Sequence, residues 1–299
     1  MTGLVTGLDW WGVGPTQMAA AVPGAVSAPM WDLRKRTDRY LMRAPFADAV
    51  SSARIRKVAR ATSFNWILVA SPHRLSERSA RYLRSRTPAL VGLLGDVPHG
   101  ARAIPSAVAD AFDTLAVPDP TWCGPTHLDS RLVVEPWGST IVDSQHLESI
   151  PYEYERLALV GTAHPERVAL ATALASRYPL VTFGDWPEIP NTTRRPASGR
   201  LGTIAELRSL RALVVNIHHA QFKSGLNPQF FDYSASGIPQ VVVYEEAPFV
   251  GHFPLSEFRS RDLRESLSPE VTRQATEAVT SLVRQDFLFR NTVERLVSR

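Results

Sequence analysis

The sequence contains a single cysteine, Cys123, among its 299 residues. One thiol cannot form an internal disulfide, and it cannot build a zinc site that depends on several cysteines. The chain is therefore predicted to be neither a disulfide-stabilised nor a cysteine-zinc protein, and Cys123 is expected to be a packing residue.

Long apolar runs are also missing. The longest, such as LVVNI at 213–217 and QVVVY at 240–244, have the length of strands and fall far short of the roughly 20 residues that span a bilayer. The start, MTGLVTGLDWWG, has no basic opening and no long apolar stretch, so it does not resemble a secretion signal. We expect no transmembrane helix and a cytoplasmic location.

The composition is that of a compact globular protein, with 44% hydrophobic and 21% charged residues. A chain of this length suits two domains of about 150 residues, each able to bury its own core. We expect an N-terminal domain over 1–150 and a C-terminal domain over 151–299, joined through an irregular stretch at 139–154.

Positive charge is concentrated in the first half. Segment 34–86 holds 14 Lys and Arg against 3 acidic residues, a balance of +11, so that the remainder carries about −7. Such asymmetry predicts a polyanionic partner for one domain: a nucleic acid, an anionic polymer or a membrane surface. A solvated, arginine-rich helical face is the alternative interpretation.

In both halves, apolar strands alternate with helical segments, which is typical of parallel sheets covered by helices. The strands are expected at 3–9, 64–71, 88–96, 113–119, 131–138, 154–162, 179–186, 210–219 and 238–245. The helices are expected from Pro15 onward and at 54–62, 75–85, 106–113, 164–178, 204–211, 228–236, about 268–283 and about 285–298. The stretch IPNTTRRPASGRLG at 189–202 is expected to be a loop.

The segment 213–243 has the features of a diphosphate site. Its strand ends in His218 and His219, its loop carries Lys223 and Gly225, and a helix starts after Asn227. A helix N-terminus offers free N–H groups and a partial positive charge, to which a lysine adds a full charge. Asp232, one turn into that helix, is placed to accept sugar hydroxyls. An ordinary strand–turn–helix with an Asn cap is the alternative.

Two further features bear on ligands. Gly161 and Thr162 end a strand just before Arg167 on the next helical turn, where an arginine fork could clamp a phosphate; a surface arginine is the alternative. Adjacent histidines on a strand point to opposite faces, so His218 and His219 are not expected to chelate one metal.

The C-terminal half resembles the spore-maturation (CgeB-like) group of GT-B glycosyltransferases. The resemblance is carried by VGTAHPER, TFGDW and VVNIHHAQFKSGLNPQFFDYSASGIPQVV, in that order over about 155–245. The N-terminal half is similar more loosely, in NWILVASPHRLSERSARYLRSRTPALVGLLGDVP and DTLAVPD. The resemblance implies an α/β protein with two facing Rossmann-like domains, whose last helix crosses back to the N-terminal domain.

The resemblance also implies that a nucleotide diphosphate sugar, most plausibly a UDP-sugar, binds the C-terminal domain. The implied donor residues are Gly161, Arg167, Gly184, His219, Lys223, Gly225, Leu226, Asn227 and Asp232, beside Thr162. No Asp-x-Asp motif is present, and no metal cofactor is expected. Where relatives show Phe-Glu-Ala, this chain has Phe231, Asp232 and Tyr233, so its carboxylate is one methylene shorter.

The catalytic group is expected from the N-terminal, acceptor-binding domain. Asp9, Asp96 and His99 each follow a predicted strand and would lie at the carboxyl edge of the sheet. Any of them could deprotonate an acceptor, although capping or turn formation would also explain them. The Gly12–Gly14 loop is a weak phosphate signal.

Transfer of a sugar to an anionic acceptor is the preferred function, with a hydroxylated DNA base as the specific candidate. Trp10, Trp11 and Trp31 are expected to stack on a base or sugar. The alternatives are glycosylation of a cell-envelope polymer, a protein or a small metabolite, and a non-catalytic module that binds nucleotide sugars or nucleic acid.

Overall fold

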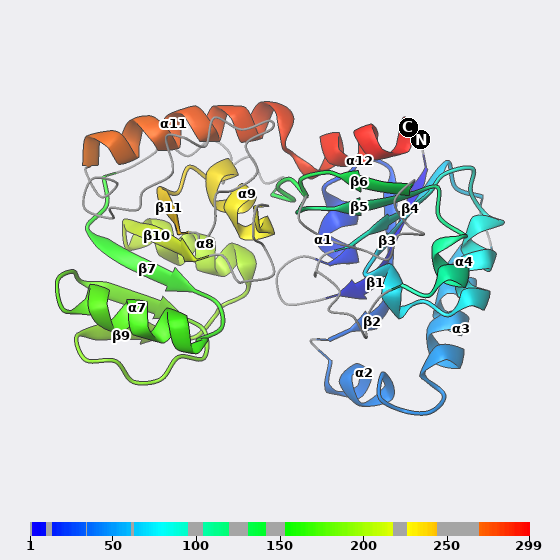
Figure 1. Cartoon of the computed structure of the whole chain (residues 1–299), viewed down its shortest axis with the longest axis horizontal. Coiled ribbons are helices and arrows are strands. Elements are labelled where there is room, and N and C mark those ends of the chain that lie inside the picture. Colours follow the sequence, from blue (N-terminus) through cyan, green and yellow to red (C-terminus); the bar gives the residue numbers. More distant parts are fainter. Residues whose placement is uncertain are drawn as a thin grey trace. The chain divides into compact units, whose positions relative to one another are not determined.

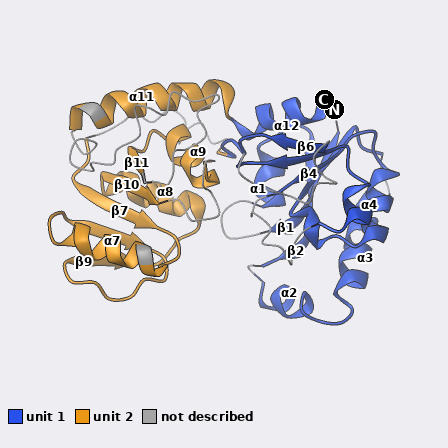
Figure 2. Ribbon diagram, viewed as in Figure 1, with its two compact units in different colours: residues 1–140, 288–299 blue, residues 141–287 orange. Residues whose placement is uncertain are grey.

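The computed structural model divides the chain into two compact units, one of residues 1–140 and 288–299 and the other of 141–287 (Figure 2). It describes residues 2–9, 14–33, 35–60, 63–94, 104–119, 131–141, 153–217, 226–243 and 269–299. The predicted domain boundary at 150/151 lies outside these residues.

Unit 1 is built on a parallel sheet in the order β2-β1-β3-β4-β5-β6. Its strands are β1 (Gly3–Asp9), β2 (Ala25–Asp32), β3 (Trp66–Ala70), β4 (Leu90–Leu93), β5 (Thr114–Val117) and β6 (Leu132–Val134). All of them were predicted except β2. That strand contains Pro29, which cannot donate to a ladder and is tolerated because β2 lies at the sheet edge.

Helices cover both faces of this sheet (Figure 1). They are α1 (Pro15–Ala20), α2 (Arg36–Leu41), α3 (Ala47–Ala59), the 3-10 turn η1 (Pro72–Arg74), α4 (Glu77–Arg84), α5 (Ser106–Ala109) and α12 (Phe289–Val297). Neighbouring residues of β1 serve opposite faces, as strand alternation requires. Leu4 packs in the cluster with Ile55 of α3, whereas Val5 packs with Met18 of α1 and Phe289 of α12.

The last helix belongs to unit 1, as expected for the C-terminal helix. Phe289, Val293 and Leu296 are buried in the core of that unit. Thr292 donates to the carbonyl of Pro136 (3.0 Å), and Arg295 to the carboxylate of Glu135 (2.7 Å). The polypeptide thus returns to unit 1 after completing unit 2.

Unit 2 has a second parallel sheet, in the order β11-β10-β7-β8-β9. Its strands are β7 (Arg156–Val160), β8 (Leu180–Phe183), β9 (Thr192–Arg195), β10 (Ala212–Ile217) and β11 (Gln240–Val243). The expectation of a loop throughout 189–202 was wrong, because TTRR forms the edge strand β9. A mostly exposed edge strand carries no apolar run, so the sequence pattern did not reveal it.

The helices described in this unit are α7 (Pro165–Ala175), α8 (Arg200–Ser209), α9 (Pro228–Ala235) and α11 (Pro269–Asp286). Leu157 and Leu213 pack on the face covered by α7, while Val214 packs with Ile204 of α8 on the other. Among the described residues, no helix is both long and apolar enough to cross a membrane. The cytoplasmic location stays a prediction.

Candidate functional site

The strand order of unit 2 reverses between β7 and β10. From β7 the chain builds outward through β8 and β9, and it then returns to add β10 and β11 on the other side. In open α/β sheets, ligands bind outside the carboxyl ends of the strands at such a switch point. Helix α7 follows β7, and α9 follows β10, so both begin at this edge.

Two glycines end neighbouring strands at the edge. Gly161 after β7 has φ +113°, and Gly184 after β8 has φ +120°, conformations that residues with a Cβ rarely adopt. A Cβ on Gly184 would lie 2.8 Å from the carbonyl oxygen of Gly161. Two chain segments therefore approach closely here, and side chains larger than hydrogen are excluded.

Arg167 spans the switch point. Its guanidinium donates from Nη1 to the carbonyl of Thr162 (3.2 Å), after β7, and from Nη2 to the carbonyl of Ile217 (2.7 Å), at the end of β10. The side chain is half-buried. The positive charge of the Arg167 guanidinium is thus fixed between the ends of β7 and β10, where the strand order reverses.

Asn227 and Leu226, two predicted site residues at the start of α9, make contacts within the protein. Asn227 caps the helix, accepting from the N–H of Phe230 (2.9 Å), and its amide donates to Asn216 (2.8 Å). Gln240 extends this network by donating to the Phe230 carbonyl (2.9 Å). Leu226 is buried in the apolar cluster beneath the helix. Any contact of Asn227 or Leu226 with a donor stays a prediction.

Asp232 is almost fully buried, at 2% exposure, and forms an ion pair with Arg200 at the start of α8. Burial lowers the pKa of the Arg200 guanidinium to about 9, which leaves it protonated at neutral pH. Burial also raises the pKa of neighbouring Tyr233, although the positive charges of Arg200 and Arg167 act to lower it. The positive charges of Arg200 and Arg167 therefore both act on this buried phenol.

Arg200 was not predicted. The segment 189–202, which was expected to be a loop, also contains Arg194 and Arg195, and nothing in the sequence distinguishes Arg200 from them. Its partner lies in another helix, so only the packing of α8 against α9 brings the two together. The role of Asp232 toward sugar hydroxyls stays a prediction, now with Arg200 as a partner.

Several predicted site residues lie outside the described part of the chain: His219, Lys223, Gly225, Asp96 and His99. His218, Trp10 and Trp11 also lie outside it. Among the residues that the structure does describe, no three His, Cys, Asp or Glu side chains are grouped to hold a metal ion. Independence from metal stays a prediction.

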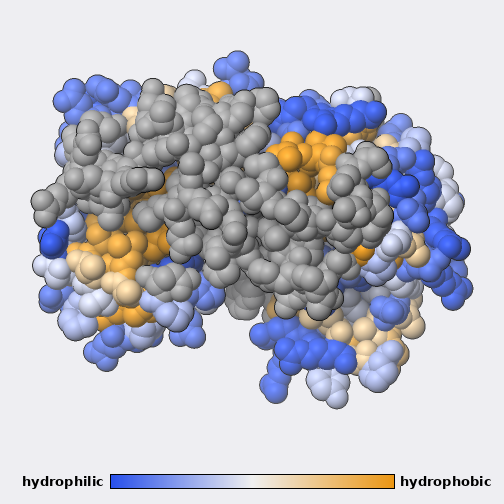
Figure 3. Space-filling view, in the orientation of Figure 1, coloured by the Kyte–Doolittle hydropathy of each residue, from blue (hydrophilic) through white to orange (hydrophobic). Residues whose placement is uncertain are grey.

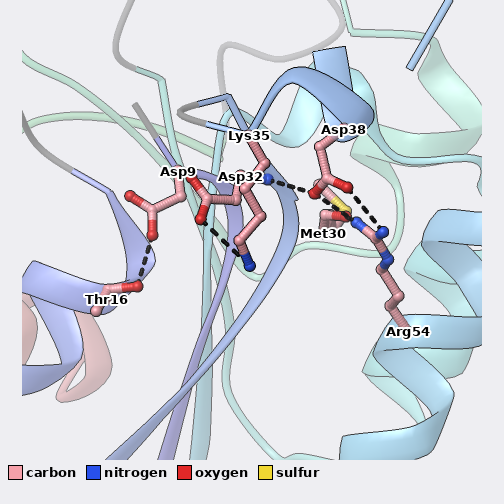
Figure 4. Close-up of polar contacts among 7 residues, drawn as sticks. All are labelled: Asp9, Thr16, Met30, Asp32, Lys35, Asp38 and Arg54. Carbon is pink, nitrogen blue, oxygen red and sulfur yellow. Dashed lines mark hydrogen bonds and ion pairs between the residues drawn. The ribbon is translucent and has the colours of Figure 1, made fainter. Parts of the chain in front are cut away.

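In unit 1, Asp9 ends β1 at the carboxyl edge of the sheet (Figure 4). Its side chain is fully buried, and Oδ2 accepts a hydrogen bond from Thr16 Oγ1 of α1 (2.5 Å). A Cβ on Gly14 would lie 2.1 Å from Oδ1, so a glycine there lets the loop pass close to the carboxylate. Asp9 therefore lies at the carboxyl edge of the sheet and is oriented by α1, while its catalytic role stays a prediction.

Asp32 ends β2 beside Asp9 and lies 3.6 Å from Lys35 (Figure 4). The backbone N–H of Asp32 donates to Asp38 of α2 (2.8 Å). Arg54 of α3 grips Asp38 with two hydrogen bonds, of 2.7 and 2.9 Å, and also donates to the Met30 carbonyl (2.9 Å). The hydrogen bond from Arg54 lowers the pKa of Asp38. Sequence patterns did not reveal this network, because Arg54 stands 16 residues from Asp38 and belongs to another helix.

Trp31 is a core residue. It is 3% exposed, and the guanidinium of Arg54 lies over its ring, 5.1 Å from the centroid. The expectation that Trp31 offers a stacking surface was therefore wrong, because its indole is buried in the core of unit 1.

No protein-family model matches the chain, and no curated protein sequence matches it. Solved structures do. The chain is similar to the glycosyltransferase SnogD from Streptomyces nogalater (TM-score 0.52, 13% identity, 100% of this chain and 99% of that one). It is also similar to sucrose-phosphate synthase from Thermosynechococcus elongatus (0.59, 10%, 100% and 97%).

A third similar structure is that of the DNA-modifying enzyme beta-glucosyltransferase, solved with and without uridine diphosphoglucose (TM-score 0.54, 8% identity, 100% of both chains). At such low identities the likeness establishes the fold alone. Over its full length, this chain has the GT-B fold of these glycosyltransferases: two Rossmann-like units with parallel sheets and a C-terminal helix returned to the first unit.

Proposed function

We propose that this chain is a nucleotide-sugar-dependent glycosyltransferase that holds its donor at the carboxyl edge of the unit 2 sheet. The observation that carries the proposal is the position of Arg167. Its guanidinium is fixed between β7 and β10 at the switch point, where this class of sheet binds ligands.

The surroundings of Arg167 suit a diphosphate. Helices α7 and α9 begin at this edge, and helix N-termini attract anions through free N–H groups and the helix dipole. Gly161 and Gly184 keep the strand ends free of side chains, so that phosphate oxygens can approach the backbone. Lys223, Gly225 and His219 would complete the site if they act as the family resemblance to the spore-maturation group implies.

The reaction follows from the charges. The acceptor hydroxyl oxygen bonds to the anomeric carbon, the bond from that carbon to the diphosphate oxygen breaks, and a base takes the hydroxyl proton. Asp9, oriented by Thr16, is our candidate for that base. Arg167 and the helix N-termini would stabilise the departing nucleoside diphosphate without a metal ion.

The acceptor of the proposed transfer is a polyanion, with a hydroxylated DNA base as the specific candidate and a UDP-sugar as donor. Support for this comes from the +11 segment at 34–86, which forms α2, α3 and α4 of unit 1. One similar structure is an enzyme that modifies DNA and was solved with uridine diphosphoglucose.

Thermal stabilisation by a panel of nucleoside diphosphates and nucleotide sugars tests the donor site. A ligand at 100 times its dissociation constant should add about 2.7 kcal/mol to the free energy of unfolding. Arg167→Ala should remove most of the shift. Arg177→Ala, which removes an exposed arginine just beyond the other end of α7, should preserve it. If no nucleotide stabilises the wild-type protein, the donor assignment fails.

A further inference from the structure

Two exposed aromatic side chains stand close together in the chain near α2. Tyr40 is 78% exposed and Phe46 is 54% exposed. Among the described residues, the other large exposed hydrophobic side chains are aliphatic: Val26, Val134 and Leu201. Exposed rings present flat faces on which a planar group can stack.

Uncompensated cations flank these rings. Arg36, Arg39 and Arg43 are exposed, and none of them forms an ion pair within the described part of the chain. The one acidic side chain among them, Asp38, points into the protein and is neutralised by Arg54. Since Arg36, Arg39 and Tyr40 are spaced i, i+3 and i+4, they share one face of α2.

Helix α2 has only six residues and would not persist alone, yet it is firmly held. Asp38 is bound by Arg54 from α3 and by the backbone of Asp32 from β2. Leu41 and Met42 pack against the apolar core. Arg36, Arg39 and Tyr40 are therefore presented by an anchored helix, and Arg43 and Phe46 follow in the segment that leads to α3. Figure 3 shows hydrophilic and weakly hydrophobic surface side by side at the end of unit 1 where Figure 1 places α2.

We propose that this α2 surface, formed by Arg36, Arg39, Tyr40, Arg43 and Phe46, binds a nucleic acid strand with unpaired bases. The proposal rests on the proposed function, because it identifies the polyanionic acceptor and where unit 1 holds it. Arginines neutralise phosphates, and aromatic rings stack on unpaired bases of any sequence.

The chemistry of the surface favours a nucleic acid over a lipid bilayer. A helix that lies in a membrane interface needs a broad apolar face. Here the aliphatic residue of α2, Leu41, packs inward, and Tyr40 and Phe46 are the large hydrophobic side chains left exposed in this segment. Two rings are too little apolar area to enter a membrane, but they are enough to stack on two bases.

Fluorescence anisotropy with a labelled oligothymidylate, and with a duplex of equal length, tests the surface. The wild-type chain should bind the single strand more tightly. Tyr40→Leu and Phe46→Leu, which remove a ring but keep an apolar side chain, should each weaken binding roughly 5- to 150-fold. Tyr40→Phe keeps the ring and should bind like the wild type. Both positions are exposed, so none of the three variants should change the melting temperature.

The salt dependence of binding shows whether Arg39 and Arg43 contact phosphates or whether any positive charge on the protein has the same effect. Arg39→Gln with Arg43→Gln should lower the slope of log affinity against log salt by about 1.4, at roughly 0.7 for each phosphate contact on a single strand. The same charge loss through Arg177→Gln and Arg290→Gln, both exposed and remote in sequence, should leave the slope unchanged.

The proposal is overturned if the two leucine variants bind the strand like the wild type, or if the duplex binds equally well. It is also overturned if vesicles of phosphatidylserine and phosphatidylcholine capture the protein through Tyr40 and Phe46 while the oligonucleotide does not bind. Stabilisation by a nucleotide sugar is measured on the same variants and should be intact, because these residues belong to unit 1. A wild-type protein that binds the strand but no nucleotide would refute the donor site alone.

Discussion

At the scale of single residues, Asp232 shows how burial changes the meaning of a mutation. Its carboxylate is the predicted contact for sugar hydroxyls, and it also neutralises the buried guanidinium of Arg200. Removing the carboxylate would leave that cation unpaired. A loss of activity in Asp232→Ala alone would therefore not distinguish a donor contact from damage to the fold.

A double-mutant cycle resolves this. Asp232→Asn should lower the free energy of unfolding by about 3–5 kcal/mol, because removing one charge of a buried ion pair leaves the other buried without compensation. Adding Arg200→Met should recover a substantial part of the loss in urea unfolding. If the two effects simply add, the pair does not stabilise the fold in the way described.

Asp38 gives a prediction about pH. The hydrogen bond from Arg54 holds its pKa in the folded protein below the unfolded value of about 3.9. The folded state therefore gains stability from the ionised carboxylate above the unfolded pKa and loses it as the pH falls through the folded pKa. Asp38→Asn should cost about 1–3 kcal/mol at neutral pH.

Melting temperatures of Asp38→Asn and the wild type, recorded from pH 7 downward, check this account. The difference between the two proteins should be constant near neutrality and should shrink below about pH 4. A difference that persists unchanged in strong acid would mean that packing, not charge, is what the substitution disturbs.

At the scale of elements, the ends of β7 and β8 depend on two glycines. Gly184→Ala would place a methyl group 2.8 Å from the Gly161 carbonyl and force an unfavourable φ of +120°. Gly199→Ala is the matched control, since its φ is +78° and no atom lies within 4 Å of the added carbon. Both should destabilise by about 1–3 kcal/mol through backbone strain. Chemical denaturation should show the larger loss for Gly184→Ala, and equal losses would contradict the close approach.

The elements also show what sequence patterns can and cannot predict. Strands such as β3 and β10 are buried on both faces, so their continuous apolar runs made them predictable. The edge strands β2 and β9 were not predicted. Pro29 interrupts the pattern of β2, and β9 consists of polar residues whose side chains are mostly exposed. Local patterns signal burial, and most side chains of β9 are exposed.

The same limit applies to the candidate site. Gly161, Arg167 and Asn227 follow strands or begin helices, so their positions could be predicted from the chain alone. The pairing of Arg200 with Asp232 could not, because it joins separate helices. The Asn227 cap was foreseen as the alternative interpretation of this segment, but the hydrogen bond from its amide to Asn216 was not.

At the scale of the whole molecule, unit 1 depends on the far end of the chain. Phe289 of α12 is fully buried among residues of β1, β3 and α1. Phe289→Ala should lower the free energy of unfolding by about 3–5 kcal/mol. Its neighbour Arg290 is exposed, and Arg290→Ala should change stability by no more than about 0.5 kcal/mol. Equal effects in thermal unfolding would contradict the return of α12 to unit 1.

The division of labour follows from this architecture. Unit 1 carries the concentrated positive charge and the buried, oriented Asp9, and unit 2 carries the switch point marked by Arg167. A polyanionic acceptor on one unit and an anionic donor on the other would account for both features. The proposed glycosyl transfer uses one ligand of each kind.

The central claim is tested most directly by following the sugar. The chain is incubated with the nucleotide sugar that stabilises it and with single-stranded DNA containing a hydroxymethylated base, and both products are measured by mass spectrometry. We predict that the strand gains one sugar residue for each nucleoside diphosphate released, and that Asp9→Asn prevents both. A nucleotide sugar that binds but stays intact with DNA, envelope polymers and proteins alike would contradict the claim and indicate a binding module.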